Sequence, residues 1–269
     1  YSAIVPCLIS SVTAAITAAA VGVHPTSFRA ENVPSFGADS SITVLQTVIM
    51  GMACAFVSIL FCFAIKKISE LYKKNIPNAY LRAAAGGLIV AAISYGLFFL
   101  TGAFDYNGAG TEVIERAFAG DCRPEAFLIK ILLTALTLGA GFKGGEIVPT
   151  MFTGATFGCF FGSLIGLPHS FGAAVGLVAV FCGVTNCPFA AMILCTELYG
   201  TGGLPYFAIA IGLSYMLSGY TGLYSAQKFY DSKYRHSKFR RFRTYSEIKQ
   251  NIKNNDTYDK KEDDSNGTD

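Results

Sequence analysis

Three long apolar runs are the feature that most constrains what this chain can fold into. They cover Ala3–Val23, Ser41–Ile65 and Ala83–Gly102, and each is close to the roughly 20 residues that a helix needs to cross a bilayer. Only 14% of the residues are charged and 52% are hydrophobic, whereas soluble domains carry about 25% charged residues. The sequence therefore predicts an all-α, polytopic membrane protein.

The beginning of the chain is apolar almost from its first residue. It starts at Tyr1, and the first apolar run begins at Ala3. No charged segment precedes this run, so we expect no signal peptide. We interpret the chain as a piece of a longer protein whose N-terminal part is missing.

Charged residues gather between the apolar runs and predict the orientation of the chain. The segment Lys66–Arg82 is basic, which is typical of cytoplasmic loops. Ala103–Glu125 is acidic and suits the outer side, with a short helix expected at Thr111–Ala119. A second basic segment, Lys228–Arg243, predicts a cytoplasmic C-terminus. The polar residues Gln250–Asp269 are expected to be disordered.

The later apolar segments are shorter and are interrupted by glycine and proline. Short, broken helices of this kind are typical of the core of a transporter. The segments are Ala126–Ala140, Pro149–Leu167, Phe171–Val184, Phe189–Leu198 and Leu204–Gly219.

Glycines recur at four-residue spacing within Pro149–Leu167. This spacing predicts one smooth helix face on which another helix can approach closely. The glycines are Gly154, Gly158, Gly162 and Gly166.

The segment Gly141–Pro149 joins two of the short helices. Its glycines allow a sharp turn and a close approach to a ligand, and Pro149 fits the first turn of the next helix. The N-terminus of a helix presents unpaired N–H groups and a partial positive charge, which attract anions. The segment is therefore either an anion site or an ordinary loop between two helices.

The cysteine and histidine residues do not form a metal-binding motif. Seven of the eight cysteines lie in apolar runs, where they behave as small hydrophobic residues. Cys182 and Cys187 lack the spacing of a zinc site. We expect no metal, no cofactor and no catalytic residue, and hence no enzyme.

Three patches of sequence together resemble the C-terminal half of the CLC family of voltage-gated chloride channels and anion/proton antiporters. Gly144–Pro149 resembles the G-x-F-x-P anion motif of that family. Asn186–Glu197 resembles a later family helix, and Leu223-Tyr224-Ser225 resembles the start of the last membrane helix. The patches also occur in the family's order, and the resemblance covers roughly residues 3–239.

The resemblance implies an anion site at Gly145, Glu146, Ile147, Val148 and Pro149, completed by the Tyr224 hydroxyl. The backbone N–H groups at the start of the helix would bind the anion.

An ionisable residue at a membrane-embedded motif is a functional hypothesis by default. We interpret Glu146 as a possible proton relay, or as an ion-pair partner of Lys143 that holds the loop. It is not interpreted as the gating glutamate of the family, which belongs to the first repeat.

The motif departs from the commonest family pattern at two positions. Ile147 replaces an aromatic residue, and Glu146 stands where an apolar residue is usual. This form resembles bacterial branches that include fluoride exporters, which tend to have threonine at the position of Val148. Fluoride is therefore an alternative to chloride as the transported ion.

The resemblance also implies the CLC fold and its assembly. Residues 1–239 would be the second of two inverted repeats, followed by a cytoplasmic tail over residues 240–269. The chain would be a multi-pass protein of the cell membrane that forms a homodimer through Phe189–Leu198 and Leu204–Gly219. Its partners would be a halide ion, protons and lipid, with no nucleic acid. A membrane scaffold without transport activity is the alternative.

Overall fold

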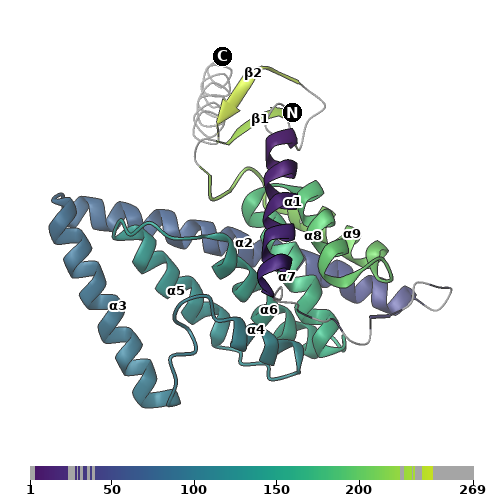
Figure 1. Cartoon of the computed structure of the whole chain (residues 1–269), viewed down its shortest axis with the longest axis horizontal. Coiled ribbons are helices and arrows are strands. Elements are labelled where there is room, and N and C mark those ends of the chain that lie inside the picture. Colours follow the sequence, from purple (N-terminus) through teal and green to yellow (C-terminus); the bar gives the residue numbers. More distant parts are fainter. Residues whose placement is uncertain are drawn as a thin grey trace, which may run out of the picture.

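A computed structural model describes residues 4–23, 28, 30, 33, 34, 37, 40–224, 227–231, 233 and 238–244 (Figure 1). The body is all-α, as predicted. Its helices are α1 (Ile4–Val21), α2 (Ser41–Asn75), α3 (Ala79–Thr101), α4 (Thr111–Phe118), α5 (Ala126–Gly139), α6 (Ile147–Leu164), α7 (His169–Thr185), α8 (Pro188–Tyr199) and α9 (Leu204–Leu217).

Two short strands follow the helical body. β1 (Lys228–Asp231) and β2 (Lys238–Thr244) pair antiparallel. The tail Gln250–Asp269, for which disorder is predicted, lies outside the described residues.

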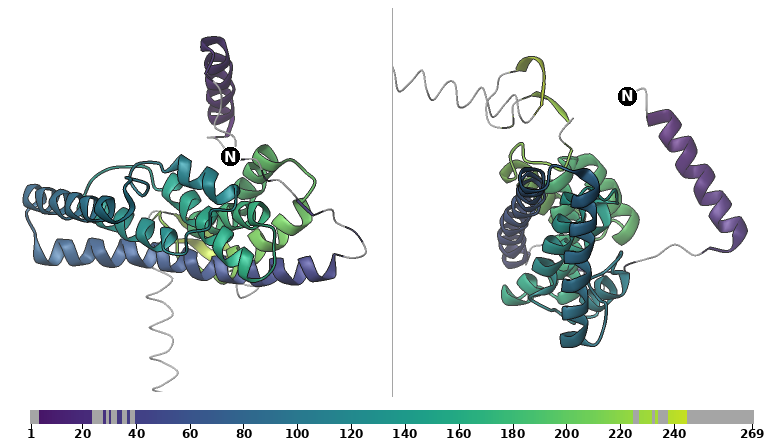
Figure 2. Two further views of the ribbon diagram at one scale, coloured as in Figure 1. Left: turned by 90° about the horizontal axis from the view of Figure 1, so that it is seen from below. Right: turned by 90° about the vertical axis from the view of Figure 1, so that its left-hand side faces the viewer.

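The helices fall into a long and a short class, as the apolar runs predict, except that α6 was expected among the short ones and belongs to the long class. Within the described part of the chain, α1, α2, α3 and α6 are long and apolar enough to cross a membrane. The apolar helices α5, α7, α8 and α9 have 12 to 17 residues, fewer than the roughly 20 needed for a full crossing. Figure 2 shows α1 standing apart from the other helices, and none of its residues is buried.

The prediction of a basic loop after the second apolar run was wrong in its first half. α2 continues to Asn75 and includes Lys66, Lys67, Lys73 and Lys74. Lysine is a good helix former, and its long side chain can lie along the helix while the charge reaches water. The chain turns at Ile76–Asn78, and the Asn78 side chain then caps α3 by accepting a hydrogen bond from the backbone N–H of Tyr80 at 3.0 Å.

The helix α7 forms the centre of the body. All of its residues except His169 and Phe181 are buried, which is typical of a helix that is apolar on every side. It packs against α2, α4, α6, α8 and α9. Because α6 contacts this buried helix along its length, the N-terminus of α6 is held in a fixed place.

Glycines bring α6 and α7 into close contact, as their spacing predicts. A Cβ atom at Gly154 would lie 2.6 Å from the carbonyl oxygen of Gly176, and one at Gly162 would lie 3.0 Å from the Cα of Gly172. A Cβ at Gly158 would collide with the Gly172 carbonyl. Gly166 does not belong to this face, because α6 ends at Leu164 and Gly166 turns the chain with φ +82°.

Candidate anion site

The N-terminus of α6 lies at the segment where the sequence predicts an anion site. α6 begins at Ile147, so Pro149 lies in its first turn as predicted. The N–H groups of Ile147 and Val148 have no earlier helical carbonyl to which they can donate. No side chain caps this end of the helix. Ile147 and Val148 are 41% and 39% exposed, so the rest of the described chain leaves this turn of α6 partly uncovered.

The approach to this helix end is irregular, as the glycines indicate. Gly141 has φ +103°, a conformation that side chains disfavour, and it turns the chain after α5. The guanidinium Nε of Arg82 donates to the carbonyl oxygen of Ala140 at 3.3 Å and so holds the end of α5. Residues 141–146 therefore form a non-helical connection between α5 and α6.

A cavity of 540 Å³ adjoins the start of α6. Its lining includes part of the predicted motif, namely Gly144, Gly145, Val148 and Pro149. One face of α5 forms another wall, with Lys130, Leu133, Thr134, Thr137 and Leu138. Val90 and Ser94 of α3 and the segment Tyr106–Ala109 contribute the rest of the lining. The start of α6 and the α5 face thus share one mostly apolar space.

Lys130 supplies a buried positive charge to this cavity, and sequence reasoning missed it. The residue is only 3% exposed. Its ammonium group donates to the carbonyl oxygens of Tyr106 at 3.1 Å and Gly108 at 2.7 Å, and it lies 4.6 Å from the centre of the Phe152 ring. The signal in the sequence was a single lysine within the apolar run Ala126–Ala140. A cation beside a helix N-terminus makes the cavity favourable for anions.

The segment that holds Lys130 is itself anchored by ion pairs. Asp105 accepts from Arg116 at 2.8 Å and from Arg123 at 3.0 Å. Tyr106 is 3% exposed, and burial raises the pKa of its hydroxyl. These contacts fix the carbonyl groups to which Lys130 donates.

Glu146 lies at the N-cap of α6 but outside the cavity lining. No ion pair joins Glu146 to Lys143 among the described residues. The alternative in which this pair holds the loop therefore finds no support in the geometry.

Tyr224 is not brought to the cavity. It is 45% exposed and lies in a non-helical segment after α9. The prediction that a helix starts here was wrong for the described residues, because 221–224 are irregular and 228–231 form β1. The segment is tied to the end of α7, where the Leu223 N–H donates to the Val184 carbonyl at 3.1 Å.

The family of the chain follows from comparison with known proteins. A family model described as voltage gated chloride channel matches residues 1–219. The chain belongs to this family. Within it, a chloride/fluoride channel protein of Pseudomonas syringae pv. tomato is 35% identical over 237 residues, which cover 87% of this chain and 52% of that protein. The chloride channel protein CLC-f of Arabidopsis thaliana is 24% identical over 71% of this chain and 26% of that protein.

Solved CLC structures share the architecture. A CLC-type fluoride/proton antiporter superposes with a TM-score of 0.75 and 28% identity, over 83% of this chain and 55% of that one. A eukaryotic CLC transporter superposes with a TM-score of 0.50 and 23% identity, which supports the fold alone. The chain therefore has the CLC fold and is a membrane protein. The chain spans about half the length of the Pseudomonas protein and of the fluoride/proton antiporter.

Proposed function

We propose that the intact protein transports a halide ion across the membrane, with the N-terminus of α6 forming part of the binding site. The observation that carries this proposal is the shared cavity, in which the start of α6 and the ammonium group of Lys130 adjoin one space. Partial charges at helix ends bind ions without trapping them, which conduction requires. Transport is favoured over an enzymatic role, since the CLC relatives are channels and transporters.

This chain then supplies half of a site. We propose that residues 1–239 are the second of two inverted repeats and that a first repeat completes the ion pathway. The exposed face at Ile147 and Val148 supports this proposal, because a motif that binds a dehydrated ion needs a second wall. Tyr224 would contribute its hydroxyl once that wall is present.

Fluoride is the second candidate for the transported ion. The relative from Pseudomonas is named a chloride/fluoride channel protein, and the structural neighbour with a TM-score of 0.75 is a fluoride/proton antiporter. Val148 stands against it, since threonine is typical of the fluoride-exporting branch at this position. The choice between the two ions rests on measurement of flux.

The assembly is proposed to be a homodimer in the cell membrane with its C-terminus in the cytoplasm. Large apolar side chains project from α8 and α9, with Phe189 85% exposed, Ile193 67% and Leu217 47%. These helices coincide with the dimer surface that the family resemblance implies. The basic segment Lys228–Arg243 supports the cytoplasmic location of the C-terminus.

Halide efflux from liposomes tests the proposed function. The full-length protein is reconstituted into vesicles loaded with chloride or fluoride, and release is followed with ion-selective electrodes. We expect efflux of at least one of the two ions above protein-free vesicles. Absence of efflux for both ions, with the protein shown to be inserted and folded, would leave the scaffold alternative.

A further inference from the structure

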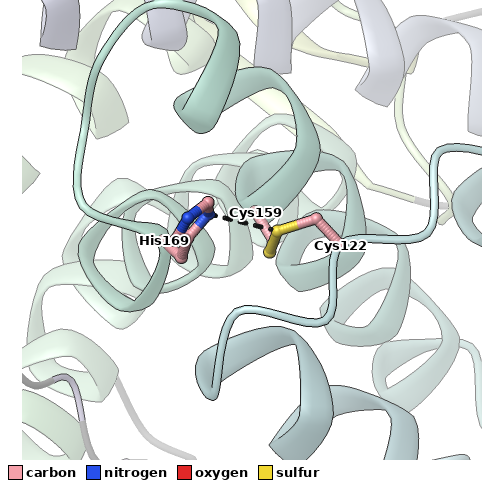
Figure 3. Close-up of side chains that lie close together, drawn as sticks. All are labelled: Cys122, Cys159 and His169. Atoms are coloured by element: carbon pink, nitrogen blue, oxygen red, sulfur yellow. Dashed lines mark hydrogen bonds between the residues drawn. A yellow bond between two sulfur atoms is a disulfide. The ribbon is translucent and has the colours of Figure 1, made fainter.

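Two cysteines and one histidine that are distant in the sequence meet at one end of α6 (Figure 3). Cys122 comes from the segment between α4 and α5, Cys159 from the last turns of α6, and His169 is the first residue of α7. Cys122 and Cys159 are joined as a disulfide, so the view of Cys159 as a simple hydrophobic residue was wrong. The Cys122 sulfur lies 3.4 Å from His169 Nδ1.

Once the disulfide is reduced, the three side chains supply two thiolates and one imidazole, which is a ligand set that suits a soft divalent cation such as Zn²⁺. Zinc binds thiolate at about 2.3 Å and imidazole at about 2.0–2.1 Å, so neighbouring ligand atoms in a tetrahedron lie roughly 3.4–3.8 Å apart. The distance between Cys122 Sγ and His169 Nδ1 is 3.4 Å, close to the roughly 3.6 Å expected between a sulfur and a nitrogen ligand of one zinc ion. All three atoms lie within 4.8 Å of one another. Opening the disulfide and rotating the two cysteine side chains would bring the sulfurs to zinc-binding separation.

We propose that these residues form a redox-gated zinc site. In the dithiol form, Cys122, Cys159 and His169 bind one Zn²⁺, and water occupies the fourth position on the side of the exposed His169. In the disulfide form, the two sulfurs have no thiolate to offer and the ion does not bind. This proposal departs from the expectation of no metal centre, and it does not depend on the transport function.

The surrounding backbone keeps the three residues together without the disulfide. The N–H of Asp121 donates to the carbonyl of Arg116 at 2.9 Å, and that of Cys122 donates to Gly120 at 3.0 Å. Arg123 pairs with Asp105 at 3.0 Å. Cys159 and the start of α7 are fixed by the close contact between α6 and α7. Reduction therefore leaves the ligands near their present places, and little ordering is needed when the ion binds.

The chemistry of the switch balances with an ordinary reductant. A phosphine takes one oxygen atom from water and becomes the phosphine oxide, while the disulfide gains the two hydrogen atoms and becomes two thiols. Binding of Zn²⁺ to the two thiolates then releases these two protons. The half-buried Cys122 and exposed His169 give the reductant and the ion access, whereas Cys159 is fully buried.

Zinc retention by the full-length protein tests the proposal. The protein is reduced with a phosphine, mixed with ZnCl2 and desalted without oxygen, and bound metal is measured by mass spectrometry. We expect the reduced wild type to hold one more zinc per chain than the oxidised wild type and than reduced Cys122→Ser. Cys187→Ser, a half-buried cysteine outside the cluster, serves as the control and should match the wild type.

A second variant keeps the test independent of folding. His169→Ala retains both cysteines and can be prepared in the disulfide form before reduction. We expect its zinc affinity to fall by at least about tenfold, because even the loss of a residue that only supports a metal ligand typically costs about 10- to 100-fold. Equal zinc content in reduced wild type and reduced Cys122→Ser, or affinity unchanged in His169→Ala, would overturn the proposal.

Discussion

At the scale of single residues, Lys130 is a buried lysine of the apolar helix α5. Few groups replace the hydrogen bonds to water that its ammonium group loses on burial. Two carbonyl oxygens accept from it, and the Phe152 ring faces it. These contacts also hold the segment Tyr106–Gly108 against the cavity. Lys130 therefore joins the outer segment to α5 and gives the cavity its positive charge.

Lys130→Met removes both hydrogen bonds while keeping a side chain of similar length. The carbonyls of Tyr106 and Gly108 then lose their donor, which costs about 1–3 kcal/mol for each unpaired group, partly offset because no cation is buried. We expect the unfolding temperature of the full-length protein in detergent to fall. Lys143→Met, at an exposed position, should leave it unchanged. An unfolding temperature of Lys130→Met equal to or above that of the wild type would mean that burial of the charge destabilises the protein at least as much as its contacts stabilise it.

Glu146 is the residue at the motif for which proton coupling can be tested directly. Glu146→Gln keeps the shape of the side chain but cannot carry a proton on and off. If Glu146 relays protons, the variant should lose proton movement coupled to the halide gradient, measured with a pH-sensitive dye in liposomes. Proton flux equal to that of the wild type would exclude the relay.

At the scale of helices, the close contact between α6 and α7 depends on glycine. Gly158→Ala would place a Cβ 2.9 Å from the Cα of Gly176 and against the Gly172 carbonyl. The helices would have to move apart, at a cost of about 1–3 kcal/mol for overpacking. Thermal unfolding of the full-length protein should show this loss.

Gly96→Ala provides the matched control on α3. A Cβ there meets no atom within 4 Å, and alanine favours a helix by roughly 1 kcal/mol over glycine. This variant should be as stable as the wild type or more so. Similar destabilisation by both variants would contradict the role of the α6–α7 contact.

Local sequence patterns predicted the helices well and tertiary sites poorly. The apolar runs predicted α3, α5 and α9 to within a few residues. The bounds of these helices depend on the length of the apolar run and on glycine or proline at its ends, which can both be read from neighbouring residues. α2 ran further than predicted because its lysines continue the helix beyond the apolar run. The cluster of Cys122, Cys159 and His169 was missed, since packing of α4 and the segment after it on α6 and α7 brings together residues up to 47 positions apart.

The candidate site was predicted in the same partial way. The position of Pro149 in the first turn of a helix and the sharp turn at the glycines follow from proline and glycine chemistry, and both were confirmed, although α6 begins two residues earlier than predicted, at Ile147. Lys130 could not be linked to them from the sequence, because the cavity that joins them depends on how α5 lies beside α6. The contribution of Tyr224 to an anion site stays a prediction.

At the scale of the whole molecule, the exposed apolar faces of α8 and α9 predict the contact between two copies. Ile193→Trp enlarges a side chain that is 67% exposed at the centre of α8. We expect this variant to shift the full-length protein from dimers to monomers, counted by single-molecule photobleaching in liposomes. Leu88→Trp on α3, at a position that is 75% exposed, should remain dimeric. Dimers that persist in Ile193→Trp would direct the search to another surface.

We propose that backbone N–H groups at the start of α6 bind the transported anion. Val148→Pro removes one of these donors at a position in the first helical turn, where proline is tolerated, whereas Val148→Ala keeps the donor and shortens the side chain. A hydrogen bond to a charged group contributes about 1.5–3 kcal/mol, or roughly tenfold to hundredfold in affinity. In halide efflux from liposomes with the full-length protein, we predict that Val148→Pro weakens the apparent anion affinity by this factor and that Val148→Ala stays near the wild type. Equal affinity in the two variants, with both proteins folded, would contradict the claim.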